Sequence, residues 1–243
     1  MGENNNFSKF AIPEDVKNVF KEITDNQVEI NLPELKLPDF NYNSLYKAAE
    51  NIGKWGWTVP FSFTLPLLGY FEKDNLTKED IDTFFKVYYS EEDNFDRLIN
   101  QIVSIQDIQQ WHTAIKQCVY AHKKNMFILS ISTLIPILEG MLSTFENDKT
   151  NTKMMKVCKE MLDSTEEKAI IDKITWTSCY HFIKTLYQKS DFSGTEPDII
   201  NRHWILHGRT AFNNSEIDSI RIFNAIETVS NIMRYHNWKK HKS

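Results

Sequence analysis

From Thr77 onward, apolar residues recur every three or four positions, which is the spacing of amphipathic helices. Only 7 glycines and 7 prolines interrupt the 243 residues, which leaves few turn residues for a loop-rich β protein. The pattern predicts helices over residues 77–89, 91 or 92 to 104, 107–124, 126–145, 153–162, 166–189 and 217–238. Thr77 and Ser215, each followed by acidic residues, are expected to cap the helices that they precede. The sequence therefore predicts an all-α fold.

The most apolar stretch of the chain, residues 126–142, lies within the predicted helix 126–145. It is apolar on nearly all sides, which predicts a central helix wrapped by its neighbours, with a kink at Pro136. Its apolar run falls short of the length needed to span a bilayer, so we expect no membrane contact. Glu139 lies within this helix, and a buried carboxylate is costly unless it is paired. An ion pair with Arg202 would satisfy both groups and could serve either a site or the core.

The N-terminal third differs from the rest of the chain. Residues 1–70 are expected to form a partly extended N-terminal arm and an aromatic, proline-rich connector, and residues 71–243 the helical domain. Within the arm, residues 14–23 predict a short helix, and the alternation over 28–32 predicts a strand or an extended segment. The connector, residues 55–66, is expected to pack on the helices, because so much exposed aromatic surface would be sticky.

Charge and cysteine content limit the functional classes. The net charge of −5 opposes strong nonspecific binding to nucleic acid, although residues 196–243 carry 7 Lys and Arg against 5 Asp and Glu. The three cysteines are far apart and include no CxxC pair, which favours a reducing compartment. The first residues have neither the basic nor the apolar region of a secretory signal. These features predict a cytoplasmic protein.

The segment from Asn201 to Gly208, Asn-Arg-His-Trp-Ile-Leu-His-Gly, places an arginine five residues before a histidine. It lies on a predicted short helix that begins at Glu196 and Pro197 and stops at the glycine. On such a helix Arg202 and His207 are about 140° apart and about 7.5 Å apart along the axis, so both can reach a ligand beside it. An imidazole suits proton transfer near neutral pH, and a guanidinium suits a phosphate and the charge that develops on it. The combination suits RNA cleavage.

Arg202 and His207, with the polar His203 directly after the arginine, resemble the Arg-x4-His signature of the HEPN superfamily of α-helical ribonucleases and toxins. The whole phrase, followed by a last long helix, is similar to that of bacterial abortive-infection and HEPN-like proteins. Residues 134–142 resemble the helix that such proteins carry upstream, with its acidic residue pointing toward the motif. The resemblance covers roughly residues 90–240.

The resemblance implies a HEPN-type helical bundle and an endoribonuclease that needs neither a metal nor a cofactor. It also implies a homodimer in which the two motifs form one composite cleft for RNA. Arg202 and His207 would be the catalytic pair, and Asn201, His203 and Glu139 would support them or position the substrate. A toxin or an antiphage defence effector, with an antitoxin or another partner from the same operon, would be the biological setting.

Other interpretations fit the same residues. Arg202 and His207 could hold together a dimer or partner interface in a non-catalytic module, in which case they would be buried without an open cleft. His203 and His207 have the i, i+4 spacing of a zinc site, but no third ligand stands at a suggestive spacing. A nucleotidyl-acceptor antitoxin of this superfamily usually has a tyrosine three residues after the motif histidine, where this chain has Thr210.

Overall fold

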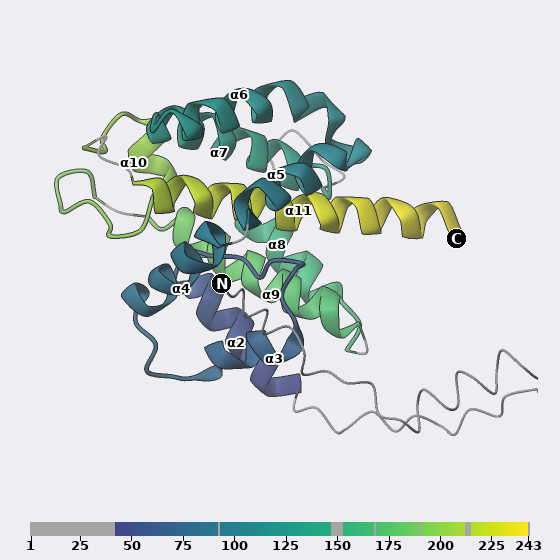
Figure 1. The fold of residues 1–243 in the computed structure, drawn as a ribbon. Coiled ribbons are helices and arrows are strands. Elements are labelled where there is room, and N and C mark those ends of the chain that lie inside the picture. The colour runs from purple at the N-terminus through teal and green to yellow at the C-terminus, as the bar shows by residue number, and fades with distance from the viewer. Residues whose placement is uncertain are drawn as a thin grey trace, which may run out of the picture. The chain divides into compact units, whose positions relative to one another are not determined.

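The helix α11 (Glu216–Lys242) runs through the middle of the described helices (Figure 1). It packs against α4 (Lys78–Ser90), α5 (Asn94–Ser104), α7 (Phe127–Ser143) and α9 (Ile170–Leu186). The structure, a computed structural model, describes residues 42–91, 93–146, 153–167, 169–189, 191–211 and 215–242. Over these ranges the chain is helical and contains no strand, which confirms the all-α prediction.

Seven further helical segments complete the described part of the chain. They are α2 (Tyr42–Lys54), α3 (Leu65–Gly69), the 3-10 turn η1 (Tyr70–Glu72), the 3-10 helix η2 (Gln106–Trp111), α6 (His112–Lys123), α8 (Met154–Ser164) and α10 (Arg202–Leu206). The predicted helix 107–124 is split into η2 and α6. The split arises because Ile108 of η2 has non-helical backbone angles (φ −115°, ψ 15°).

The helix α2 is part of the bundle, since it packs along α9. Its buried side chains lie on one face, and Gly53 brings the two backbones close together. A Cβ atom at Gly53 would lie 2.5 Å from the Cβ atom of His181 and 2.7 Å from the carbonyl oxygen of Ser178. Only a residue without a side chain permits this approach.

This packing corrects the expected boundary at residue 70. The compact unit that contains the helices begins at Asn41, so residues 42–70 belong with the helical domain rather than with an arm. The helix expected over 14–23 and the strand or extended segment expected over 28–32 lie outside the described residues.

Capping side chains fix two of the helix starts, as predicted. The hydroxyl of Thr77 accepts from the amide of Asp80, and the Asp80 carboxylate accepts from the amide of Thr77 at 2.9 Å. Ser215 and Asp218 make the same exchange at the start of α11. Each exchange satisfies amide groups that the first helical turn leaves without a partner.

The aromatic connector packs on the helices, as predicted. Trp57 is fully buried and stacks on Phe85 of α4, with ring centroids 4.1 Å apart. Its indole N–H donates to Asp82 at 2.7 Å. Phe63 extends the same cluster, 5.6 Å from Phe85. Trp57 therefore belongs to the core, whereas Trp55 of the same connector is half-buried and Phe61 is exposed.

The central position belongs to α11 and not, as expected, to the segment 126–145. The helix α7 packs on α6, α8, α10 and α11, but Leu129 and Pro136 on its other side are exposed. In α11, by contrast, polar residues as well as apolar ones are buried over more than three turns. No helix of the described residues is both long and apolar enough to cross a membrane.

Candidate functional site

The motif helix α10 begins later than predicted. Residues 196–200 are not helical, and Asn201 is the N-cap of a helix that runs only from Arg202 to Leu206. The side-chain oxygen of Asn201 accepts from the amides of His203 at 2.9 Å and Trp204 at 3.3 Å. An asparagine cap of this kind sets the helix start, whereas the acidic residue and proline at 196–197 lie in an irregular segment before it. The end is as predicted, because Gly208 takes a left-handed conformation (φ +65°) just after the helix.

Asn201 also ties α10 to the end of α9. Its side-chain N–H donates to the carbonyl of Gln188 at 2.7 Å, and the residue is 3% exposed. Both ends of the amide are therefore used within the fold. Its side chain therefore supports the motif helix, and a part of Asn201 in positioning a substrate stays a prediction.

Arg202 is held by a carboxylate from α7 and a phenol that follows α9. Its Nε donates to Glu139 Oε1 at 2.8 Å, which confirms the predicted ion pair. The hydroxyl of Tyr187 donates to the same oxygen, and the Arg202 guanidinium lies over the Tyr187 ring, 5.7 Å from its centroid. The Arg202 and Glu139 side chains are 26% and 24% exposed, so the pair lies at the surface rather than in the core.

These contacts fix the protonation states of the group. The hydrogen bond with Glu139 raises the pKa of Arg202. Burial, followed by the hydrogen bond to Glu139, raises the pKa of Tyr187 well above its usual value. Tyr187 therefore remains a phenol that donates, and Arg202 remains a cation.

The two motif histidines continue the group along α10. The His203 ring meets the Tyr187 ring edge-on at 6.1 Å and lies nearly parallel to the His207 ring, 6.3 Å away. Burial, followed by the charge of Arg202, lowers the pKa of His203, which favours its neutral form. His207 caps the helix end and is exposed. We call Glu139, Tyr187, Arg202, His203 and His207 the α10 cluster.

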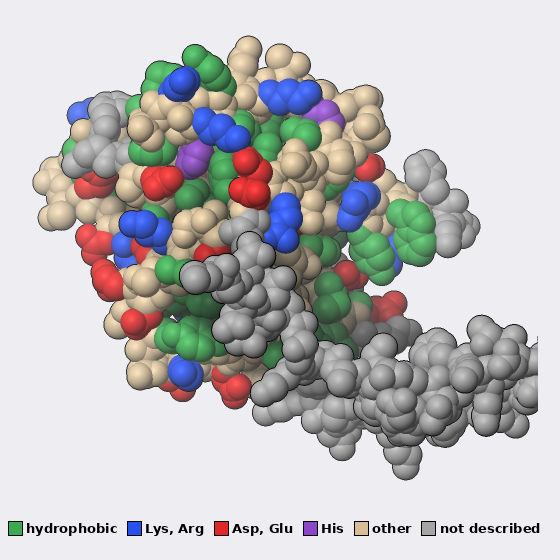
Figure 2. All heavy atoms as spheres, in the orientation of Figure 1, with side chains coloured by type: hydrophobic (Ala, Val, Ile, Leu, Met, Phe, Trp, Pro, Cys, Tyr) green, Lys and Arg blue, Asp and Glu red, His purple; other side chains and the backbone are tan. Residues whose placement is uncertain are grey.

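Two further cations border the α10 cluster. Lys189, exposed three residues after α9, is close enough to His203 to lower its pKa. The Arg209 guanidinium lies 5.5 Å from the centroid of Phe192, and that ring contacts His207 at 5.8 Å. On the face shown in Figure 2, basic and acidic side chains are intermixed rather than gathered in one broad patch. Lys189 and Arg209 are the two cations that these contacts place beside the cluster.

Sequence reasoning found four members of the α10 cluster but not Tyr187. The hydrogen bond between Tyr187 and Glu139 joins residues 48 positions apart, so no local sequence pattern predicts it. The only sequence signal is a tyrosine just before the turn that leads to the motif. Among the described residues, His, Cys, Asp and Glu side chains form no group of three or more that could hold a metal ion.

Comparison of the chain with protein-family profiles, with curated proteins and with solved structures gave no match.

Proposed function

We propose that this protein is a metal-independent endoribonuclease with its site at the α10 cluster. The observation that carries the proposal is the joint placement of an oriented arginine, a histidine held toward its neutral form and an exposed histidine on one short helix and its C-cap. A general acid–base group beside a fixed cation is what cleavage of an RNA phosphodiester requires.

In the proposed reaction, Arg202 holds the scissile phosphate and stabilises the charge that develops on it. His207 takes the proton of the 2′-hydroxyl or gives a proton to the leaving 5′-oxygen. The 2′-oxygen bonds to phosphorus, and the bond from phosphorus to the 5′-oxygen breaks. The products are a 2′,3′-cyclic phosphate and a 5′-hydroxyl. His203, in its neutral form, can accept a hydrogen bond from the sugar.

The wider setting follows from the resemblance of the motif. We propose a HEPN-type bundle that acts as a homodimer, with one composite cleft formed by two copies of the cluster. A cytoplasmic toxin or antiphage effector, with an antitoxin or operon partner, fits this proposal. The all-α architecture and the short motif helix ahead of α11 are compatible with it.

The test is incubation of the purified protein with total RNA in EDTA, beside Arg202→Ala and His207→Ala. Arg97→Ala is the matched control, because Arg97 is an exposed arginine on α5, away from the motif. We expect the wild type and the control to cut RNA, and both motif variants to lose at least a hundredfold in rate, since acid–base catalysis alone contributes about 10²–10⁴-fold. Circular dichroism checks that each variant is folded.

The ends of the fragments test the chemistry separately. Upstream fragments should carry a 2′,3′-cyclic phosphate, and 3′-hydroxyl ends would contradict the proposed attack by the 2′-oxygen. Equal cutting by all four proteins would assign the activity to another site or to a contaminant. Analytical ultracentrifugation, with a dimer as the expected result, tests the composite cleft.

A second candidate is a non-catalytic dimerisation or protein-interaction module. The ion pair between Arg202 and Glu139 favours this candidate, because such a pair can also stabilise an interface. In that case Arg202→Ala and His207→Ala would weaken self-association in the ultracentrifuge, and the wild type would leave RNA intact.

A further inference from the structure

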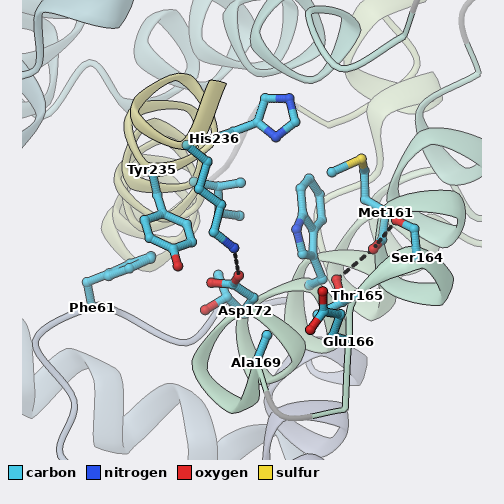
Figure 3. Close-up of a pocket in the computed structure, with 13 residues that line it drawn as sticks. Phe61, Met161, Ser164, Thr165, Glu166, Ala169, Asp172, Tyr235 and His236 are labelled. Atoms are coloured by element: carbon cyan, nitrogen blue, oxygen red, sulfur yellow. Dashed lines mark hydrogen bonds and ion pairs between the residues drawn. The ribbon is translucent and has the colours of Figure 1, made fainter. Parts of the chain in front are cut away.

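A cavity of about 500 Å³ lies between α8, the first turns of α9 and the C-terminal half of α11. Figure 3 shows Phe61 and Tyr235 side by side on one side of it, next to Asp172 of α9. A second hollow of about 480 Å³ adjoins it and shares these three residues. A volume of this size accommodates a small organic molecule.

The cavity already holds an ammonium group that belongs to the protein. Lys239 Nζ lies 3.2 Å from Asp172 Oδ2 and 4.4 Å from the centroid of the Tyr235 ring. A carboxylate on one side and an aromatic face on the other are the two partners that bind organic cations. The Lys239 side chain is 51% exposed, and a half-exposed ion pair is weak because water competes with it. Another ammonium can therefore displace Lys239.

The charge of the cavity and its aromatic lining favour a ligand that carries both an ammonium group and an alkyl chain. Asp172 is the carboxylate of the lining that pairs with the Lys239 ammonium, so displacement of that ammonium leaves Asp172 ready to bind another cation. Phe61, Trp176 and Tyr235 supply aromatic surface for an alkyl chain. An anion would be repelled by the Asp172 carboxylate, and a neutral molecule could not replace the Lys239 ammonium as its counter-ion.

We propose that this cavity binds a small organic molecule with a primary ammonium and an alkyl stem, which replaces the Lys239 ammonium between Tyr235 and Asp172. This site is separate from the α10 cluster. Asp172 lies in the first turn of α9 and Tyr187 directly follows its last, 15 residues later, which corresponds to about 22 Å along a helix. The proposal does not depend on ribonuclease activity.

Isothermal titration calorimetry of the full chain tests the proposal with n-pentylammonium, which resembles the lysine side chain. The uncharged 1-pentanol is the matched probe. We expect Lys239→Gln to bind n-pentylammonium at least fivefold more tightly than the wild type, because the internal competitor is gone. Adding Asp172→Asn to that variant should reverse the gain. Lys159→Gln is the control, because Lys159 pairs with Asp163 on α8 and does not line the cavity.

Two results would overturn the proposal. One is equal binding of 1-pentanol and n-pentylammonium by the Lys239→Gln variant, since the site would then recognise only the alkyl chain. The other is an affinity of Lys239→Gln no higher than that of the wild type and the Lys159→Gln control. Thermal melting of each variant, together with the indole N–H signal of Trp176 in NMR titrations, distinguishes loss of the site from loss of the fold.

Discussion

At the residue scale, the α10 cluster is organised around one carboxylate oxygen. Glu139 Oε1 accepts from Arg202 Nε and from the Tyr187 hydroxyl, so a single atom of α7 orients a cation and a phenol. The Tyr187 ring then supports both Arg202 and His203. The orientation of Arg202 consequently depends on two helices other than the one that carries the motif.

Tyr187→Phe should lower the free energy of unfolding by about 1.5–3 kcal/mol, because it removes one hydrogen bond to a charged group and leaves the ring in place. Urea denaturation measures the change. Tyr120→Phe, at a tyrosine that is 62% exposed, is the control and should change the stability little. Equal stability of the two variants would mean that the Tyr187 hydroxyl contributes nothing. The NMR signal of Arg202 Nε–H should also exchange faster with water in Tyr187→Phe alone.

A second carboxylate, Glu227 of α11, lies in a very different environment. It is 1% exposed, and burial raises its pKa to about 7 despite the polar groups around it. Oε1 accepts from the Asn231 side chain at 2.7 Å, whereas Oε2 is buried with no hydrogen-bond partner in the described part of the chain. The folded protein therefore keeps a proton here that the unfolded chain releases at a lower pH.

The pKa of Glu227 predicts how stability depends on pH. Between the usual pKa of 4.5 and the folded value of about 7, the folded state binds more protons, so its stability falls as the pH rises through this window and then levels off. The loss is on the order of 3 kcal/mol. Glu227→Gln should remove this slope and exceed the wild type in stability at pH 8. Urea denaturation at pH 5, 6, 7 and 8 measures the difference, and parallel curves for the two proteins would contradict the prediction.

At the scale of elements, the contact between α2 and α9 depends on a position without a side chain. The two helices approach so closely at Gly53 that any Cβ atom would meet the backbone of α9. A backbone atom cannot rotate away as the end of a flexible side chain can, so one helix would have to move.

Gly53→Ala should therefore destabilise the protein by about 1–3 kcal/mol, although alanine is the better helix former. Gly69→Ala is the matched control, because a Cβ atom at Gly69 meets nothing within 4 Å. Thermal melting compares the two. A melting temperature for Gly53→Ala equal to that of Gly69→Ala would show that α2 can shift without cost.

The elements also indicate what could be predicted from the sequence. The helices that begin at Thr77 and Ser215 have both capping partners within three residues, so their starts could be predicted. The start of α10 could not be predicted from the sequence. Asn201 caps the helix while its side chain also binds the carbonyl of Gln188, and that contact joins residues 13 positions apart. The pair of Glu139 and Arg202 could be predicted from the cost of a lone carboxylate in an apolar helix, whereas Tyr187 gives no such signal.

At the scale of the whole described bundle, α11 brings polar groups into the core. Arg221 is fully buried and pairs with Asp82 of α4 and, at 2.8 Å, with Asp218. Trp57 and Lys78 also bind Asp82. Burial alone would raise the pKa of Asp82, but the charge of Arg221 and these hydrogen bonds outweigh it and hold the pKa low. The network therefore joins α11, α4 and the aromatic connector.

Arg221→Met should cost about 3–5 kcal/mol, because it leaves the buried Asp82 and the half-buried Asp218 without their main counter-ion. Arg97→Met, at an exposed arginine, is the control and should change the stability by less than about 0.5 kcal/mol. Chemical denaturation measures both. A small effect of Arg221→Met would mean that Lys78 and Trp57 are sufficient partners for Asp82.

The central place of α11 has a consequence for synthesis on the ribosome. The hydroxyls of Thr58 and Thr228 are 2.8 Å apart although 170 residues separate them, and α11 follows every other described helix. At a synthesis rate of about 5–20 residues per second, roughly ten seconds or more pass between the synthesis of Thr58 and that of Thr228. During that interval the apolar faces of α4, α5, α7 and α9 have left the tunnel without the helix that covers them. Nascent chains that stop before Glu216 should therefore be substrates for chaperones and proteases, and chains that include α11 should escape both.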